Sequence, residues 1–213
     1  MTQNTIAPII GIDRGASFTD FAVVDSDGLS DIFSIESRSW QRIRTACEEL
    51  ITKYRTRHIV FSGSASGMPT SMKNIVNIIA EIDAIGFGGA TLANCNKCVV
   101  VSMGTGSAIV HFANNSAEHL GGSGVGGGTI KGLSSLICGI DNPARIEALA
   151  LRGNASKLNL TISDLGYEQI SFLGADMTAS NFADLKSNRI EDQAAAILNL
   201  VGETVGIIAS ICA

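Results

Sequence analysis

The stretch that decides the fold lies near the N-terminus and reads Ile9-Ile10-Gly11-Ile12-Asp13-Arg14-Gly15-Ala16-Ser17. It joins an apolar strand to a glycine turn, and a second apolar strand, Phe21–Val24, follows. Two short apolar runs on either side of a glycine turn predict a hairpin. Because glycine lets backbone N–H groups approach an anion closely, the tip of this hairpin suits a phosphate group.

Two further glycine-marked segments lie in the second half of the chain. One is Val99-Val100-Val101-Ser102-Met103-Gly104-Thr105-Gly106-Ser107, and the other is Gly121–Gly128, with six glycines in eight residues. A carboxylate segment, Glu81-Ile82-Asp83-Ala84, stands between the first and second loops. Two such loops facing each other across a cleft suit the phosphates of a nucleotide better than one loop would. The pattern therefore predicts ATP-dependent chemistry.

The composition indicates a globular protein with a substantial core. Hydrophobic residues make up 46% of the 213 residues and charged residues 16%, enough for a substantial core. The net charge is −5 and the chain has no basic cluster, so we expect no nucleic-acid partner. Met1–Thr5 has no basic segment followed by an apolar one, and no uncharged apolar run reaches the roughly 18–20 residues of a membrane span. We expect a cytoplasmic protein with no membrane partner.

Five cysteines are scattered along the chain: Cys47, Cys95, Cys98, Cys138 and Cys212. An odd, scattered set argues against a disulfide framework. Cys95-Asn96-Lys97-Cys98 has the spacing of a metal-binding or redox pair, but no second such pair or nearby histidine pair accompanies it. Since it directly precedes a strand, we interpret it as a structural turn.

The coarse pattern predicts two α/β lobes, residues 1–95 and 96–213, that open alike with strand, glycine turn, strand, strand and helix. The predicted strands are Ile9–Ile12, Phe21–Val24, Asp31–Ile35, His58–Gly63, Val99–Ser102, Ala108–Phe112 and Ser116–Leu120. The predicted helices are Trp40–Tyr54, a segment through Ile75, Ile78 and Ile79 that leads to Glu81, Thr129–Ile137, Pro143–Arg152, Ala179–Leu185 and Gln193–Ile211. The apolar segment Ile197–Ala213 is interpreted as a buried helix.

Several of these pieces resemble known kinases. Gly11-Ile12-Asp13-Arg14-Gly15 and Gly104-Thr105-Gly106-Ser107 resemble the phosphate loops of the actin, Hsp70 and sugar-kinase superfamily. More narrowly, five segments in the same order resemble type II pantothenate kinases over essentially the whole chain. These segments are Glu81–Ala84, Met103–Ser107, Gly121–Leu133, Asp176–Phe182 and Val201–Val205.

The resemblance implies a two-lobed, actin-like (ribonuclease H-like) ATPase fold. It implies transfer of the γ-phosphoryl group of ATP to the primary hydroxyl of pantothenate or a related alcohol, the first step of coenzyme A biosynthesis. It also implies Mg²⁺ as a cofactor and a homodimer. Phosphoryl transfer depends on positioning and charge neutralisation, and a carboxylate can accept the proton of the attacking hydroxyl. The same chemistry is thus expected from the residues themselves.

The resemblance assigns roles to individual residues. Glu81 is the candidate general base, and Asp13 the candidate anchor for Mg²⁺ through its water shell. Ser107 and His119 are candidate substrate contacts. The candidate nucleotide-binding residues are Asp13, Gly15, Ala16, Ser17, Gly104, Thr105, Gly106, Gly126, Gly127 and Gly128. The predicted helix that begins where the glycine run ends would point its N-terminal N–H groups at a phosphate.

Three features depart from the family pattern. Asp20 stands where the first loop usually ends with a lysine, and Glu118-His119 stands where an arginine contacts substrate. Family members continue for two more strands after the segment that ends here at Ala213, so the second lobe is expected to be incomplete at its C-terminus. Two alternatives stay open: a catalytically impaired or regulatory relative that binds a nucleotide or an acyl-CoA, and an activator-type ATPase with a cluster at Cys95 and Cys98.

Overall fold

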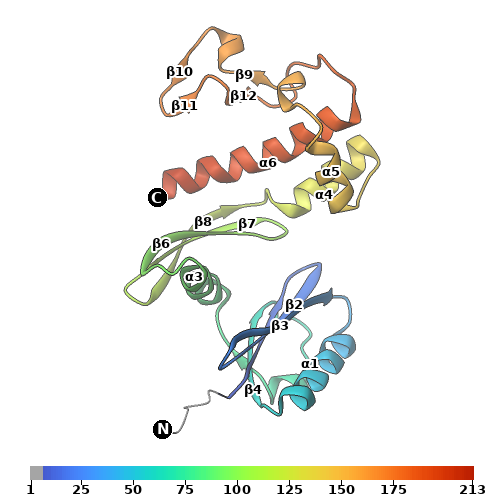
Figure 1. The fold of residues 1–213 in the computed structure, drawn as a ribbon, viewed down its shortest axis with the longest axis vertical. Helices are drawn as coiled ribbons and strands as arrows, with labels where there is room; N and C mark the ends of the chain where they lie inside the picture. Colours follow the sequence, from blue (N-terminus) through green and yellow to red (C-terminus); the bar gives the residue numbers. More distant parts are fainter. Residues whose placement is uncertain (1–6) are drawn as a thin grey trace. The chain divides into compact units, whose positions relative to one another are not determined.

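The computed structural model describes residues 7–213 (Figure 1). The N-terminal residues, for which the sequence predicts no signal peptide, lie outside this range. The described chain forms two compact units. The first holds the chain up to Val100 together with Val110–His119, and the second holds Val101–Ile109 together with Leu120–Ala213.

The first unit is built on a five-stranded sheet with the strand order β3-β2-β1-β4-β5. Its strands are β1 (Ile9–Arg14), β2 (Phe18–Asp25), β3 (Gly28–Glu36), β4 (His58–Gly63) and β5 (Asn77–Ile78). The neighbours β1, β2 and β3 pair antiparallel, while β4 is parallel to both β1 and β5. The three N-terminal strands and the strand His58–Gly63 confirm the sequence prediction.

Helix α1 (Trp40–Tyr54) connects β3 to β4 and covers one face of this sheet (Figure 1). The side chain of Ser39 caps its first turn, and Ile43, Cys47 and Leu50 form its buried stripe. The stripe packs on inward-facing residues of the strands. The fully or largely buried core consists of Ile10, Ile12, Phe21, Val23, Ile43, Cys47, Leu50, Ile59, Phe61, Met68, Met72 and Val76.

The segment before Glu81 corrects one sequence prediction. Instead of a helix through the isoleucines, the chain forms a short helix α2 (Thr70–Lys73), then β5, and only then helix α3 (Glu81–Leu92). Ile78 pairs in register with Phe61, and the N–H of Ile79 donates to the Phe61 carbonyl at 2.9 Å. Pairing with the sheet edge thus overrides the helical spacing of the isoleucines.

A second sheet has the order β6-β7-β8, with β6 (Lys97–Met103), β7 (Ser107–Ala113) and β8 (Ser116–Ser123). The division between the two units passes through this sheet. Within the first unit α3 packs on β7 and β8: the rings of Phe87 and Phe112 meet edge to face at 5.0 Å, and a Cβ on Gly86 would lie 2.6 Å from the Ala117 side chain. Close packing of the helix therefore requires glycine at that position.

The turn between α3 and β6 contains Cys95, whereas Cys98 is the second residue of β6. The N–H of Cys95 donates to Ala90 and that of Asn94 to Thr91, while Asn94 has a positive φ of 50°. This is the Schellman arrangement that ends many helices. The predicted turn is therefore confirmed at Cys95, whereas Cys98 belongs to the strand, and both thiols are free.

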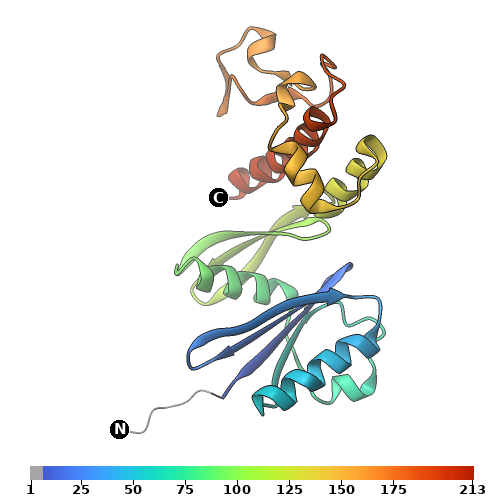
Figure 2. The same cartoon turned by 45° about the vertical axis from the view of Figure 1, so that its right-hand side comes forward.

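The second unit is mainly helical (Figure 2). Helices α4 (Gly127–Cys138), α5 (Pro143–Ala150) and α6 (Ile190–Cys212) share a small core formed by Ile140, Ile146, Leu149 and Ala194. The segment between α5 and α6 holds two 3₁₀ turns and two short strand pairs. These elements are η1 (Ala155–Lys157), β9 (Leu160–Thr161), η2 (Ser163–Leu165), β10 (Gln169–Ile170), β11 (Leu173–Gly174) and β12 (Thr178–Ser180).

The helix predicted at Ala179–Leu185 is wrong. Its beginning belongs to β12, and the rest is irregular, with a positive φ of 55° at Phe182. The N–H of Phe182 donates to the side-chain carbonyl of Asn159, and that of Thr178 to the Glu203 carboxylate. Side chains that are distant in sequence thus satisfy the backbone groups that a helix would pair internally.

Helix α6 is longer and less buried than the sequence suggests. Ile197, Val201 and Val205 lie on its buried face, whereas Ile211 in the last turn is 71% exposed. The expected buried helix is therefore buried on one face only. With 23 residues it also has the length and composition of a membrane-spanning helix, a property that core helices of soluble proteins share.

Candidate functional site

The candidate site of the first unit lies where β1 and β4 end. These strands are parallel, so their carboxyl ends meet at one edge of the sheet, the usual place for ligands in such folds. Asp13 on β1 is the register partner of Ser62 on β4 and of Asp20 on β2, and Asp20 is the partner of Ser34 on β3. Cross-strand partners point to the same face, so these four polar side chains form one row across the sheet.

The surroundings of Asp13 disfavour its negative charge. Partial burial is the largest cause that raises its pKa, and the negative charges of Glu81 and Asp20 raise it further. The nearby Ser62 hydroxyl acts in the opposite direction, although it forms no hydrogen bond of good geometry. A site that destabilises a carboxylate in this way favours a bound proton or a cation.

The first glycine loop, residues 13–17, turns at the tip of the β1–β2 hairpin. The N–H of Gly15 donates to the Phe18 carbonyl at 2.9 Å, and the Ser17 carbonyl accepts from the N–H of Ser37. Within residues 7–213, the N–H groups of Ala16 and Ser17 have no acceptor. Two consecutive free N–H groups in an exposed turn are the donors that bind phosphate oxygens in glycine loops.

Arg14 fixes the base of this loop from the opposite face of the sheet. Its guanidinium donates to the carbonyls of Ser64 at 3.0 Å and Ser37 at 3.3 Å, and lies 4.5 Å from the ring of Trp40. Gly63, with a φ of 81°, allows β4 to approach closely, since a Cβ there would lie 2.4 Å from the Arg14 carbonyl oxygen. Arg14 thus has a structural role that the sequence reasoning did not identify.

Glu81 is the first residue of α3, and Asp83 lies in the same turn. The positive end of the helix dipole favours both carboxylates. The hydrogen bond from Ile79 to Phe61 holds the start of α3 beside the end of β4, and the Glu81 charge acts on Asp13. The structure therefore brings Glu81, Asp13 and the first glycine loop together within one unit. His119, in the middle of β8, is exposed in the same unit.

The second glycine loop, residues 104–107, packs on the glycine run in the second unit. The N–H groups of Gly127 and Gly128 donate to the carbonyls of Gly104 and Thr105 at 2.8 and 2.9 Å. A Cβ on Gly126 would lie 2.4 Å from the Gly106 carbonyl oxygen. These glycines allow direct contact between two backbone segments. Their nucleotide-binding role stays a prediction, and the N–H groups of Gly127 and Gly128 are already engaged within the protein.

Ser107, the other candidate substrate contact, exchanges a hydrogen bond with Ser123 at 2.9 Å. Helix α4 begins at Gly127, inside the glycine run and two residues before the predicted start at Thr129. The nucleotide-binding candidates Gly104, Thr105 and Gly106 lie with Ser107 in this unit.

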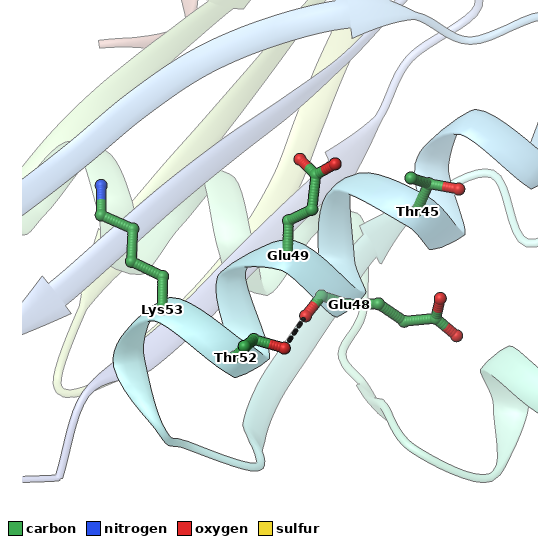
Figure 3. Close-up of a pocket in the computed structure, with 5 residues that line it drawn as sticks. All are labelled: Thr45, Glu48, Glu49, Thr52 and Lys53. Atoms are coloured by element: carbon green, nitrogen blue, oxygen red, sulfur yellow. Dashed lines mark hydrogen bonds between the residues drawn. The ribbon is translucent and has the colours of Figure 1, made fainter.

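Two hollows lie outside the row of polar side chains. Figure 3 shows the one on α1, whose walls are side chains of a single exposed helix face: Thr45, Glu48, Glu49, Thr52 and Lys53. The other lies beside α3, next to Glu81, and is lined by Ile79, Asp83, Ala84, Phe87, Asn115 and Ser116. The first contains no candidate residue, and the second reaches Asp83 rather than Glu81.

The residues around Asp13 fit a magnesium ion that keeps most of its water. In the part of the chain that the structure describes, no three His, Cys, Asp or Glu side chains gather closely enough to enclose a metal ion. Mg²⁺ is usually bound by one or two carboxylates, water and substrate phosphates. The unpartnered Ser62 hydroxyl and the carboxylates of Asp13 and Asp20 satisfy that requirement.

Comparison with solved structures defines the class of fold. The chain is similar to component A of (R)-2-hydroxyglutaryl-CoA dehydratase from Acidaminococcus fermentans, with a TM-score of 0.64 and 12% identity over 98% of this chain and 80% of that one. The mixed α/β architecture is the actin-like fold that the family resemblance implies.

Comparison with known sequences identifies the family within this class of fold. The model of the Fumble family matches residues 90–213. A type II pantothenate kinase of Bacillus cereus is 35% identical over 92% of this chain and 75% of its own length, and one from Oceanobacillus iheyensis is 28% identical over 93% and 76%. The chain belongs to the type II pantothenate kinase family, a family of phosphotransferases.

Proposed function

We propose that this chain transfers the γ-phosphoryl group of ATP to the primary hydroxyl of pantothenate, the first step of coenzyme A biosynthesis. Family membership supports the reaction and the small-molecule substrate. The observation that carries the proposal within the structure is the position of Glu81 at the start of α3, which the hydrogen bond from Ile79 to Phe61 holds at the end of β4, the strand that pairs with β1 and Asp13.

The proposed chemistry follows from these positions. Glu81 accepts the proton of the pantothenate hydroxyl as its oxygen attacks the γ-phosphorus and the bond to the ADP oxygen breaks. The free N–H groups of Ala16 and Ser17 hold phosphate oxygens in place. Asp13 would hold Mg²⁺ through its water shell, and the ion would supply neutralisation of the phosphate charge.

Further parts of the proposal rest on the family resemblance. The second glycine loop contributes to nucleotide binding, and Ser107 and His119 contact pantothenate. The two-lobe division at residues 1–95 and 96–213, a homodimer, a cytoplasmic location and the lack of nucleic-acid and membrane partners belong to the same proposal. His119 offers fewer N–H donors to an anion than the arginine that stands there in the family, so we expect this chain to hold pantothenate loosely.

The proposal is tested by ADP release from Mg·ATP with and without pantothenate. We expect release that depends on pantothenate and falls by about 10²–10⁴-fold in Glu81→Gln, the usual contribution of a general base. Asp83→Asn, in the same helical turn, is the matched control and keeps most of the activity. If nucleotide raises the melting temperature but pantothenate causes no ADP release, the chain is a binding relative and the kinase assignment is wrong.

A further inference from the structure

Two aspartates, Asp13 and Asp20, lie opposite each other on neighbouring strands. They are direct register partners in the antiparallel pair of β1 and β2. Side chains at such positions lie about 4.5–5.5 Å apart at their Cβ atoms, and like charges there destabilise the sheet. The pair therefore has an unfavourable electrostatic energy that a bound cation would remove.

Nothing in the described chain supplies that cation. Within residues 7–213, neither carboxylate forms an ion pair with a lysine, an arginine or a histidine. Arg14 is adjacent in sequence, but it points to the other face of the sheet and is bound by Ser64, Ser37 and Trp40. The only hydrogen bond to Asp20 comes from the Ser34 hydroxyl, again among the described residues.

A second observation points to a ligand at the same place. Ser62 is the partner of Asp13 on β4 and is only 5% exposed, and within residues 7–213 its hydroxyl forms no hydrogen bond of good geometry. Leaving a buried hydroxyl unpaired costs about 1–3 kcal/mol. A hydroxyl oxygen beside two carboxylates is a hard donor, suited to Mg²⁺ or to a water molecule bound to it.

We infer that Asp20 completes a divalent-cation site with Asp13 and the Ser62 hydroxyl, and that this site binds Mg²⁺ or Mn²⁺ before any nucleotide is present. Two carboxylates and a hydroxyl leave several positions of an octahedral ion for water, which is the arrangement that Mg²⁺ prefers. The role of this ion in catalysis rests on the proposed function, but its binding does not.

The test is titration of the full chain with Mn²⁺ in the absence of nucleotide, with free Mn²⁺ followed by electron paramagnetic resonance. We expect one site per chain, displaced by Mg²⁺. Asp20→Asn should weaken binding about tenfold or more, and Ser62→Ala should weaken it as well. The control is Asp25→Asn, because Asp25 lies at the other end of β2 and is bonded to Ser30 and to the N–H of Asp27.

Melting curves show whether each variant is folded. Without metal, Asp20→Asn should melt at a higher temperature than the wild type, since it removes one of two facing charges. Added Mg²⁺ at a fixed concentration should raise the melting temperature of the wild type by more than that of Asp20→Asn. Equal Mn²⁺ affinity in Asp20→Asn and the wild type, or no Mn²⁺ binding by the wild type, overturns the inference.

The outcomes separate this inference from the proposed function. If Asp20→Asn binds Mn²⁺ like the wild type while the wild type phosphorylates pantothenate, the function stands and the role of Asp20 is wrong. If Mn²⁺ binding depends on Asp20 but pantothenate causes no ADP release, the site stands and the function is wrong.

Discussion

The contact between the glycine run and the second glycine loop gives the sharpest structural prediction. In Gly126→Ala the new Cβ would lie 2.4 Å from the Gly106 carbonyl oxygen, whereas ordinary contacts begin at 3.4 Å. The two backbone segments must therefore separate by about 1 Å, enough to lengthen hydrogen bonds of 2.8 and 2.9 Å beyond their normal range. Gly126 has an extended backbone that alanine can adopt, so the effect comes from the contact alone.

The expected loss follows from these contacts. Two main-chain hydrogen bonds contribute about 0.5–1.5 kcal/mol each, and overpacking adds about 1–3 kcal/mol. Gly126→Ala should thus lower the free energy of unfolding by about 2–6 kcal/mol, or the melting temperature by about 5–15 °C. Gly124→Ala is the matched control, because a Cβ there meets nothing within 4 Å. Equal free energies of unfolding for Gly126→Ala and Gly124→Ala, measured by heat and by urea, would contradict this prediction.

Three further predictions concern the first unit. Gly88→Ala should stabilise the protein by about 0.5–1 kcal/mol, because the new Cβ in α3 meets no atom within 4 Å. Gly89→Ala should destabilise the protein by about 1–3 kcal/mol, because its Cβ would lie 2.4 Å from a valine of β6. Unfolding curves with the same midpoint for both variants would contradict this pair of predictions. Burial raises the pKa of the Cys47 thiol to about 11, so iodoacetamide should modify Cys47 only after unfolding. Modification of Cys47 in the native protein, located by peptide mass spectrometry, would contradict this prediction. Because folding raises the pKa of Asp13, the ionised carboxylate lowers the stability of the protein above that pKa. In EDTA, Asp13→Asn should therefore raise the melting temperature near neutral pH, and this gain should shrink toward about pH 4. A gain that does not depend on pH would show that the ionisation of Asp13 is not its cause.

The sequence predicts the parts of the fold that local patterns determine. The α1 helix from Trp40 to Tyr54 agrees to the residue, because its apolar stripe and its serine cap are both local signals. The segments around Ile78 and Phe182 do not agree. There, pairing with a distant strand or side chain decides the backbone, and no local pattern reveals that pairing.

In the candidate site, too, local motifs predict some residues, whereas contacts between distant segments decide the rest. Asp13 and Glu81 could be selected from motifs, but their proximity depends on how α3 is held at the end of β4. The row that contains Asp20 and Ser62 depends on strand register, which the sequence leaves open. Asp20 stands out in the sequence only as a departure from the family, although the two-residue alternation of a hairpin could have placed it opposite Asp13.

The central claim is that this chain is a pantothenate kinase with Glu81 as its base. The most direct measurement is transfer of label from [γ-³²P]ATP to pantothenate by the wild type and by Glu81→Gln, with products separated by chromatography. We expect labelled phosphopantothenate with the wild type and its loss in the variant. Label found only in ATP and inorganic phosphate, with a folded protein that binds ATP, would contradict it.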